Sequence, residues 1–514
     1  MKISSIKYFL FAIGITLFQS CATDAKKPDK PTKPNVVVVY LDDLGYGDMS
    51  AYGATEINTP NMDRIANEGL RFTNGYATSP TCTPSRYGLL TGVYPWRNEK
   101  AQILPGSAPL IIKTTQETLP KMMKRAGYQT AVIGKWHLGL GDGNLDWNGK
   151  IAPGPNEVGF DHAYILAATQ DRVPTVYIDN GKVDGLDPND PIQVSYKQNF
   201  EGEPTGKDNP ELTTMKWHHG HNNSIVNGIP RIGYMKGGEA AKWSDIDMAD
   251  HFINKVKSYI KNQKSKPFFL YYALQQPHVP RTPHPRFAGL SGMGPRGDAI
   301  LEADWCIGEL LKTLEKEGIL ENTLIVFSSD NGPVLNDGYY DEAVELLGNH
   351  TPAGALRGGK YSLFEAGTRV PFMTYWKGMI EPGVSDAMVC QMDLLASLAS
   401  MLGVEADTLD SQNLIDALLG KSKEGRQYLI QGENKGTALR AGDWVMIPPH
   451  EGNPISINTG TELGKSLDYQ LYNLRDDIGQ QNNLADTNPE KLQELIAKYE
   501  EIRGVKTTKL DNKE

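Results

Sequence analysis

Two pairs of side chains with oxygen donor atoms each end a strongly apolar run of this sequence. Asp42 and Asp43 end one run, and Asp330 and Asn331 end another. Three carboxylates and one amide oxygen form a hard donor set that suits Ca²⁺ and also accepts Mg²⁺. A single Asp-Asp pair is more often a turn or a helix cap. The prediction of a metal site therefore requires that both pairs lie on one edge of the fold.

Four further side chains offer nucleophilic and acid–base chemistry. Cys82 supplies a thiol within the string CTPSR, although a lone cysteine is more often a small buried hydrophobe. Lys135 and His137 are two residues apart, so both point to one side of an extended chain. Prolines flank His278, and a histidine has a reference pKa of about 6.5, which suits proton transfer near neutral pH.

A series of short motifs resembles those of the type I sulfatases of the alkaline phosphatase superfamily. They are CTPSR at 82–86, LLTG at 89–92, GKWHLG at 134–139, GGK at 358–360, EAGTRVP at 365–371 and LYNLRDDIGQQNNLA at 471–485. The single departure noted is Ala366, where the family usually has glycine, and it affects only local turn geometry. The resemblance extends from Asn35 to Ala485, with all motifs in the family order.

The resemblance implies that Cys82 is oxidised before folding to Cα-formylglycine, by a formylglycine-generating maturation enzyme. The hydrate of this aldehyde carries two hydroxyls on one carbon, so one can attack sulfur and the other can later expel sulfate. The resemblance also places Ca²⁺ against a formylglycine oxygen and a sulfate oxygen, where it would polarise the S–O bond. The implied metal site consists of Asp42, Asp43, Cys82, Asp330 and Asn331.

The resemblance assigns roles to five more residues. Lys135 would bridge sulfate and hydrate, while His137 would orient or deprotonate the hydrate. His278 would be the general acid on the ester oxygen, and Lys360 would hold a sulfate oxygen next to the leaving group. Arg86 would hydrogen-bond the hydrate. In a site that excludes water, these cations would offset the carboxylates and the sulfate far more strongly than in solution.

Four apolar, β-branched runs stop abruptly at polar residues that include these side chains. They are Asn35–Leu41, Thr130–Ile133, Phe268–Leu274 and Leu324–Phe327. Nearly continuous hydrophobicity is typical of strands buried on both faces, and amphipathic patterns such as Leu119–Arg125 and Ala299–Lys316 lie between them. Alternating strands and helices predict an α/β fold with a large, mostly parallel but mixed sheet flanked by helices. Ligands bind beyond the carboxyl ends of such strands, so the four polar clusters should share one rim.

Shorter segments follow beyond residue 400. Ala438–Ile447 and Tyr469–Leu474 predict a small antiparallel sheet, closed by a helix at Pro489–Arg503. We therefore expect an alkaline-phosphatase-like catalytic unit at 35–400 and a smaller α+β subdomain at 401–514.

The amino terminus is predicted to be a targeting segment. Residues 1–21 combine a basic start with the apolar stretch Tyr8–Phe18, which is too short to span a bilayer but right for a signal-peptide core. LFQSC resembles a loose lipobox that would acylate Cys21, with 22–34 as a Lys- and Pro-rich tether. We expect an exported protein, in the periplasm or on the outer membrane of a Gram-negative bacterium, attached only through Cys21. Ordinary cleavage just after this segment is the alternative.

Composition limits the classes of function. A formal net charge of -10 argues against a nucleic-acid binder that works by neutralising phosphates, but a local cationic cluster can still bind an anionic substrate. The 52 glycines and 32 prolines among 514 residues indicate long functional loops. Besides Cys21 and Cys82, the chain has only Cys306 and Cys390, which we expect to be two separate buried thiols.

Two other functions compete with a sulfatase. Phosphatases and phosphodiesterases of the same superfamily use Ser or Thr near two metals, whereas this chain has Cys82 and one metal set. A glycan-binding lipoprotein without activity would not need Lys135, His137, His278 and Lys360 together. Sulfate release from a sulfated sugar, with and without a chelator, separates the three.

The long polar insert Asp161–Trp243 is the expected region of substrate recognition. Asp171 and Arg172 place an acceptor beside a fork-shaped donor, which suits adjacent sugar hydroxyls, although a surface ion pair is an equal alternative. The string WHHGH ending at His221 could bind zinc by composition, but its spacing is not a standard ligand set, so sugar contacts are favoured.

This insert resembles that of bacterial sulfatases acting on galactose and N-acetylgalactosamine. It implies exo-acting removal of a 6-O-sulfate from mucin O-glycans or chondroitin-type chains, with the 3-O and 4-O positions as alternatives. The predicted substrate-binding residues are Asp171, Arg172 and His221.

Overall fold

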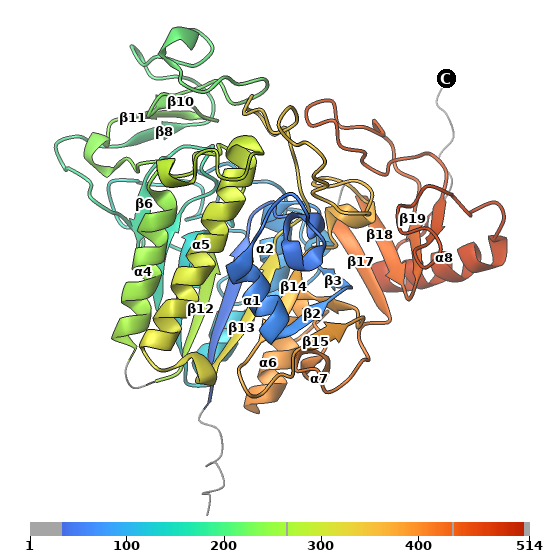
Figure 1. The fold of residues 1–514 in the computed structure, drawn as a ribbon. Coiled ribbons are helices and arrows are strands. Elements are labelled where there is room, and N and C mark those ends of the chain that lie inside the picture. The colour runs from blue at the N-terminus through green and yellow to red at the C-terminus, as the bar shows by residue number, and fades with distance from the viewer. Residues whose placement is uncertain (1–32, 264–265, 434–435, 508–514) are drawn as a thin grey trace, which may run out of the picture.

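A large mixed sheet forms the centre of the fold (Figure 1). The computed structural model describes residues 33–263, 266–433 and 436–507. The ten strands, in spatial order, are β15 (Gly383–Ser385), β2 (Leu70–Phe72), β14 (Phe372–Tyr375), β13 (Thr323–Ser329), β1 (Asn35–Leu41), β12 (Phe268–Ala273), β4 (Gln129–Lys135), β5 (His162–Leu166), β6 (Tyr177–Asp179) and β7 (Lys182–Val183). The strands from β13 to β5 are parallel, whereas β14 and β6 run antiparallel to their inner neighbours. The predicted sheet is therefore confirmed.

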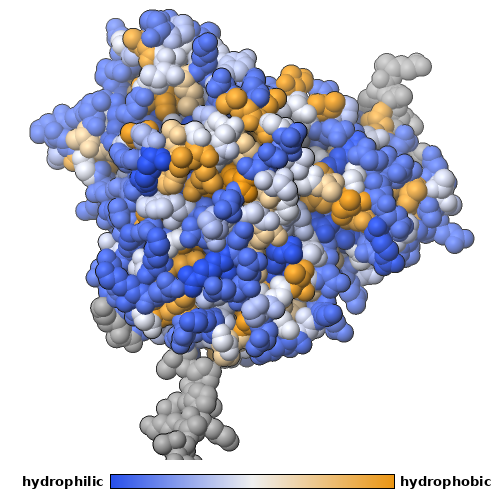
Figure 2. Space-filling model, viewed as in Figure 1, coloured by the Kyte–Doolittle hydropathy of each residue, from blue (hydrophilic) through white to orange (hydrophobic). Residues whose placement is uncertain are grey.

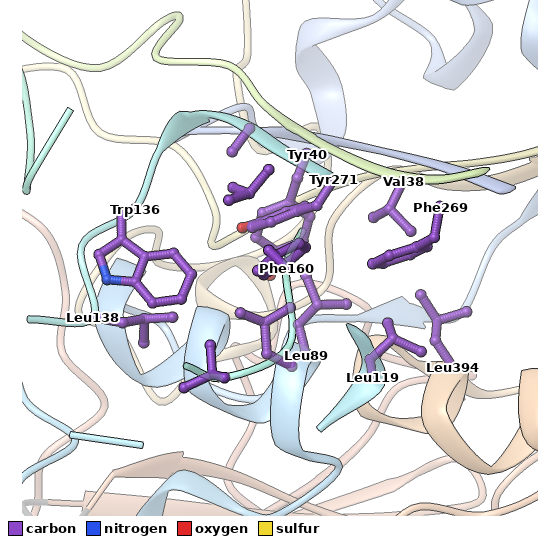
Figure 3. Packing of buried hydrophobic residues seen from close by; sticks show 14 of the residues in the cluster. Val38, Tyr40, Leu89, Leu119, Trp136, Leu138, Phe160, Phe269, Tyr271 and Leu394 are labelled. Atoms are coloured by element: carbon purple, nitrogen blue, oxygen red, sulfur yellow. The ribbon is translucent and has the colours of Figure 1, made fainter. Parts of the chain in front are cut away.

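The apolar runs form strands because both of their faces are covered by helices. Val38 and Tyr40 of β1 pack in one core cluster with α2 (Cys82–Thr91), α3 (Leu119–Arg125) and α6 (Leu394–Leu402). Val37 and Val39 point to the other face, towards α1 (Pro60–Glu68), α4 (Met248–Asn262) and α5 (Gly294–Lys316). Figure 1 shows α4 and α5 side by side, and Figure 3 shows Trp136, Phe160 and Tyr271 within the first cluster.

Both amphipathic patterns correspond to helices, but only one of them predicts both ends of its helix. The pattern at Leu119–Arg125 coincides with α3. The pattern at Ala299–Lys316 is part of α5, which begins earlier, at Gly294. Pro295 lies in the first turn of α5, where its missing N–H costs no helical hydrogen bond, so the helix starts before its apolar pattern does.

The predicted small antiparallel sheet is present near the carboxyl end. Its strands, in order, are β17 (Tyr428–Glu433), β18 (Gly436–Ala441), β19 (Trp444–Ile447) and β20 (Gln470–Asn473). Leu495 and Tyr499 of α8 (Pro489–Arg503) share one core cluster with this sheet, and Figure 1 shows the unit beside the main body. The division of the chain between 35–400 and 401–514 stays a prediction.

Short elements complete the fold. They are β3 (Gly75–Tyr76), β8 (Gln193–Ser195), β9 (Ile225–Val226), β10 (Ile229–Pro230), β11 (Tyr234–Lys236), β16 (Val389–Cys390) and α7 (Ile415–Leu418). β8, β10 and β11 belong to the insert between β5 and β12, and Figure 1 shows them beyond one end of the large sheet. The insert is therefore placed to cover a rim of the sheet.

The predicted signal segment, the lipidated Cys21 and residues 22–32 lie outside the described residues. Cys306 and Cys390 are free and buried, which confirms the expectation of separate thiols. Across the described part of the chain, no helix combines the length and apolarity needed to cross a membrane. Figure 2 shows a mostly hydrophilic face with small, separate apolar patches, as is usual for a protein surface in water.

Candidate active site

The two predicted donor pairs meet at the carboxyl ends of β1 and β13. These strands are adjacent and parallel, so the residues that follow them emerge together. The backbone N–H of Asp43 donates to Asp330 Oδ1 over 3.2 Å, and Asn331 Nδ2 donates to Asp43 Oδ1 over 2.7 Å. Asp42 and these three residues are fully buried, and together they form one acidic cluster.

The amino terminus of α2 lies against this cluster. Cys82 is the first residue of the helix, and its Sγ is 3.4 Å from Asp42 Oδ1. Arg86 follows one turn later on the same face of the helix. Its Nε and Nη2 donate to Asp330 Oδ2 over 3.0 and 2.7 Å, and its Nη1 donates to Tyr271 Oη over 3.1 Å. The helix thereby places the thiol and the guanidinium on the acidic cluster.

Two lysines pair with the remaining carboxylates. Lys135 ends β4, and its Nζ donates to Asp42. Lys360 Nζ donates to Asp43 Oδ2 over 2.9 Å and to Asp337 Oδ2 over 2.8 Å. The surrounding carboxylates hold the pKa of Lys360 well above its usual range, although burial opposes this shift. Both lysines are buried against these carboxylates.

The donor atoms fit a hard divalent cation. Ligand atoms of Asp42, Asp43, Cys82 and Asp330 all lie within 4.8 Å of one another. Burial, reinforced by the nearby Asp330 charge, raises the pKa of Asp42 to about 8 and also raises that of Asp43. Asn331 Oδ1 is buried without a hydrogen-bond partner among the described residues. Closely spaced carboxylates and an unused amide oxygen are the donors that a Ca²⁺ or Mg²⁺ ion would bind.

The two histidines differ in the ring nitrogen that is left available. His278 Nδ1 is 2.6 Å from the Val279 carbonyl oxygen, so it donates there, and Nε2 lies 3.9 Å from Asp43 Oδ2. His137 donates from Nε2 to the Leu104 carbonyl over 2.9 Å, while its Nδ1 is buried with no partner among the described residues. His278 therefore offers Nε2 for chemistry, and His137 offers Nδ1.

The pKa of His278 departs from the reference value of about 6.5 for a histidine. Burial, followed by the charges of Lys360 and Lys135, lowers the pKa of His278 well below its ordinary value. Burial and the charge of Lys135 lower the pKa of His137 in the same direction. Sequence reasoning missed this because it did not place both lysines against the imidazoles.

The predicted substrate-binding residues form a connected group. Asp171 lies 2.9 Å from His221 Nε2 and 3.1 Å from Arg172 Nη1. Although burial opposes ionisation, Arg172 and His221 hold the pKa of Asp171 well below its usual range. Arg172 Nη1 also donates to Thr169 Oγ1 over 2.6 Å. The fork of Arg172 and the carboxylate of Asp171 are therefore both charged and held in place.

One cavity of about 150 Å³ unites the two groups. Its lining residues are Cys82, Ile103, His137, Asp171, Arg172, His219, Gly220, His221, Ile232, His278, Asp337, Lys360 and Tyr361. Lys135 and Arg86 do not line the cavity. They contact it only indirectly, because Lys135 donates to Asp42 and Arg86 donates to Asp330. Candidate nucleophile, acid and sugar-binding residues thus surround a space that fits one small group.

Sequence reasoning missed Asp337 and Tyr361. Asp337 pairs with Lys360, and Tyr361 Oη donates to Asp337 Oδ1 over 3.2 Å. The string LNDG around Asp337 is typical of an exposed turn, so no local signal indicated its burial. Among the described residues, no close group of three or more possible metal ligands includes His218, His219 or His221.

Comparisons with known proteins agree with this chemistry. The family model "Sulfatase" matches residues 34–404. Over 497 residues the chain is 49% identical to an N-acetylgalactosamine-6-O-sulfatase of Bacteroides thetaiotaomicron, covering 95% of this chain and 97% of that protein. It is 32% identical over 490 residues to arylsulfatase A of Homo sapiens, covering 90% and 86%.

A solved structure from work on glycosaminoglycan metabolism by Bacteroides thetaiotaomicron is also similar. It superposes with a TM-score of 0.91 at 50% identity and covers 92% of this chain and 100% of its own. The motifs, the buried site and these matches lead to one conclusion: the chain belongs to the sulfatase family and is a sulfuric ester hydrolase.

Proposed function

We propose that this sulfatase removes the 6-O-sulfate from terminal galactose or N-acetylgalactosamine of host or environmental glycans. The observation that carries the proposal is that Cys82, His278, Asp171 and Arg172 line one small cavity. A cavity of about 150 Å³ admits the end of a glycan rather than its middle, which supports exo action. The name of the 49% identical relative supports the sugar and the position.

We further propose that Cys82 is converted to formylglycine by a maturation enzyme and that Ca²⁺ binds Asp42, Asp43, Asp330 and Asn331 beside it. A hydrated aldehyde supplies two hydroxyls on one carbon, and a bound cation polarises a sulfate oxygen. The acidic cluster supports this proposal, because its hard donor atoms lie close together and Asn331 Oδ1 has no hydrogen-bond partner among the described residues. Mg²⁺ is the alternative ion.

The residues of this chain hold the sulfate and move a proton. Lys360 and Lys135 attract the anionic group, and Arg86 keeps Asp330 in position through two hydrogen bonds. His278 already donates from Nδ1, so only its Nε2 can bring a proton to the ester oxygen. The negative charge of a bound sulfate raises the low pKa of His278, so substrate itself promotes the acid form.

The regiochemistry follows from the need for a second anchor. A 6-O-sulfate stands on a flexible arm, so the sulfate site alone does not orient the ring. Asp171 and Arg172 would bind O3 and O4, and an axial O4 would reach the charged pair where an equatorial O4 would not. Polar groups left unpaired in a closed site cost about 1 to 3 kcal/mol each, so galacto-configured sugars should be preferred.

Sulfate release, measured by ion chromatography, tests this proposal. The matured enzyme should desulfate 6-sulfated N-acetylgalactosamine far faster than 6-sulfated N-acetylglucosamine, and Asp171→Ala and Arg172→Ala should lose that preference. Faster release from the 3- or 4-sulfated galacto sugars would overturn the regiochemistry while leaving the sulfatase assignment intact.

Mass spectrometry of the Cys82 peptide tests the cofactor. Coexpression with a formylglycine-generating enzyme should yield an aldehyde and activity, both absent from Cys82→Ala. A chelator should remove activity, and added Ca²⁺ should restore it. A fully active preparation with an unmodified thiol at Cys82 would contradict the proposal.

We also propose export to the periplasm or outer membrane with a lipid at Cys21. The basic start and the lipobox-like LFQSC support it. Palmitate labelling of the wild type, lost in Cys21→Ala, is the expected result, and equal labelling of both would refute it.

A further inference from the structure

A second cavity of about 370 Å³ lies beside the catalytic one. Both are lined by His219, Asp337 and Tyr361, so these three side chains form a shared wall. The remaining lining residues of the second cavity are Pro80, Thr81, Leu363, Glu433, Gly436, Ser456, Asn458, Thr459, Leu463 and Lys465. The two cavities are therefore immediate neighbours, with these three side chains between them.

The sizes of the two cavities suggest how a glycan is divided between them. The catalytic cavity, at about 150 Å³, is below the range of about 300–1,000 Å³ that is usual for a complete ligand site. It suits a sulfate with its terminal sugar, and the following sugar must lie outside. The neighbouring cavity, at about 370 Å³, has room for that sugar.

The carboxyl-terminal unit supplies much of the second cavity. Ser456, Asn458, Thr459 and Lys465 belong to the long connection between β19 and β20, and Glu433 ends β17. Hydrogen bonds from Thr459 N to Ser456 Oγ (3.3 Å) and between the hydroxyls of Thr459 and Thr461 (3.0 Å) fix this loop locally. The loop is therefore a built wall that faces the catalytic half of the molecule.

The lining has the mixed chemistry that a sugar requires. Leu363 and Pro80 offer apolar surface to C–H groups, while Ser456 and Asn458 offer hydroxyl and amide groups. The Lys465 ammonium provides hydrogen-bond donors and positive charge. The carboxylate of Asp337 is paired with Lys360 at 2.8 Å, which weakens its repulsion of an anionic ligand.

We propose that the second cavity binds the sugar next to the sulfated terminus and that Lys465 recognises a carboxylate on it, as in a uronic acid. The inference rests on the proposed function, since it needs a terminal 6-sulfated sugar in the catalytic cavity. Charge-assisted hydrogen bonds to a carboxylate are about twice as strong as neutral ones, so Lys465 would favour an acidic neighbour over a neutral one. The enzyme is thereby selective for alternating glycans of amino sugar and uronic acid.

Kinetics on three substrates test the inference. They are 6-sulfated N-acetylgalactosamine, its disaccharide with glucuronic acid on the reducing side, and the same disaccharide with glucose instead. In the matured holoenzyme, Lys465→Ala should lower kcat/KM for the acidic disaccharide relative to the monosaccharide about tenfold. The same ratio for the neutral disaccharide should stay unchanged. Asn458→Trp, which fills the cavity, should lower both ratios.

Lys498→Ala is the matched control, because it removes the same charge from α8 of the same unit and lines neither cavity. If Asn458→Trp lowers kcat/KM equally for the monosaccharide and for both disaccharides, the second-sugar site is overturned. Equal effects of Lys465→Ala on the acidic and neutral disaccharides would overturn the recognition of a carboxylate.

Calorimetric binding to the Cys82→Ser protein separates this inference from the proposed function. Wild-type enzyme that releases no sulfate from any of the three substrates contradicts the function. The Cys82→Ser protein should still bind the acidic disaccharide more tightly than the neutral one, and the Cys82→Ser, Lys465→Ala double variant should not. This result would support the second-sugar site even without activity, whereas equal binding of the two disaccharides to Cys82→Ser would refute it.

Discussion

The charges around His278 make its protonation state depend on whether substrate is bound. Burial, followed by the charges of Lys360 and Lys135, keeps the pKa of His278 low, which favours a neutral ring in the site without substrate. A sulfate ester brings negative charge into the same space and shifts the balance towards the imidazolium. Protonation is thereby coupled to occupation of the site by an anion.

His278→Ala is expected to affect substrates according to their leaving groups. A sugar alkoxide needs a proton as the S–O bond breaks, whereas an aryl oxide leaves with little help. The variant should therefore lose at least about a hundredfold more kcat/KM on a sugar sulfate than on an aryl sulfate. Parallel assays of both substrates measure this difference, and equal losses would mean that His278 only positions sulfate.

Residues that belong to motifs were predictable, whereas residues that depend on the fold were not. Asp42 and His278 each come after an apolar strand and Lys135 ends one, so their meeting on one rim followed from the α/β pattern. Asp337 lies in a loop with a turn-like sequence, and its burial depends on Lys360 reaching it from another segment. Contacts between two loops leave no periodic signal in a sequence.

Neighbouring segments hold the proposed sugar-binding residues, Asp171 and Arg172, in position. Arg231, which follows β10, donates from Nη1 to the Gln170 carbonyl over 2.7 Å and pairs through Nη2 with Asp245 at 2.7 Å. The backbone N–H of Ile232 donates to the Asp171 carbonyl over 2.8 Å. The segment with the sugar-binding residues is therefore fixed from both its backbone and its flank.

Arg231→Lys is expected to loosen this segment while keeping the charge. A lysine has no planar fork and cannot bond Gln170 and Asp245 in the same geometry. The KM for a sugar sulfate should rise about threefold to tenfold. The KM for an aryl sulfate, which has no sugar hydroxyls to contact Asp171 and Arg172, should change less. Steady-state kinetics on both substrates provide the measurement. Arg64→Lys on the surface is the control, and equal changes on both substrates would contradict a positioning role.

Glu302 on α5 makes stability depend on pH. Burial raises the pKa of this carboxyl from 4.5 to about 7, although it accepts hydrogen bonds from the backbone N–H of His284 and from Gln276. The folded state thus binds the proton more tightly than the unfolded state. Its contribution is complete below about pH 4.5 and is lost as the pH rises through about 7.

Urea unfolding at pH 5.5 and 8.5 checks this expectation. The loss of unfolding free energy between these pH values should be smaller in Glu302→Gln than in the wild type, because a neutral side chain does not ionise. Glu315→Gln, at an exposed position of the same helix, should leave the wild-type difference unchanged. An identical pH dependence in Glu302→Gln would contradict the assignment.

The strand and helix pattern predicted the centre of the sheet better than its edges. β1 and α3 were evident because a continuous apolar run and an amphipathic pattern each mark a fully packed element. β2 and β15 have only three residues each, so their sequences carry too little pattern. They become strands because β14 offers an edge on which β2 pairs, and β2 in turn offers an edge on which β15 pairs.

At the scale of the whole molecule, the acidic cluster joins segments that are distant in sequence. Asp42 follows β1, Asp330 follows β13, and α2 contributes Cys82. A cation bound there would stabilise the folded chain alone, because the unfolded chain does not assemble these donors. Ligand binding and global stability are therefore linked at this point.

Ca²⁺ is expected to raise the melting temperature, and chelation is expected to lower it. At about 100 times the dissociation constant, one bound ion adds about 2.7 kcal/mol to stability. Asp42→Asn should reduce the shift, while Asp476→Asn, on the surface of the carboxyl-terminal unit, should not. Calorimetric melting with Ca²⁺ and with chelator measures the effect, and a melting temperature that ignores both would rule out a structural ion.

The burial of Cys82 means that its side chain is accessible to another protein only before folding is complete. Its side chain is only 2% exposed in the folded chain and faces Asp42 from beneath the cavity. The maturation enzyme proposed above would have access to Cys82 only while α2 is not yet packed. The active fraction would then depend on the rate of modification relative to the rate of folding, and molecules that fold first would stay inactive however stable they are. For this chain, faster folding would lower the yield of working enzyme.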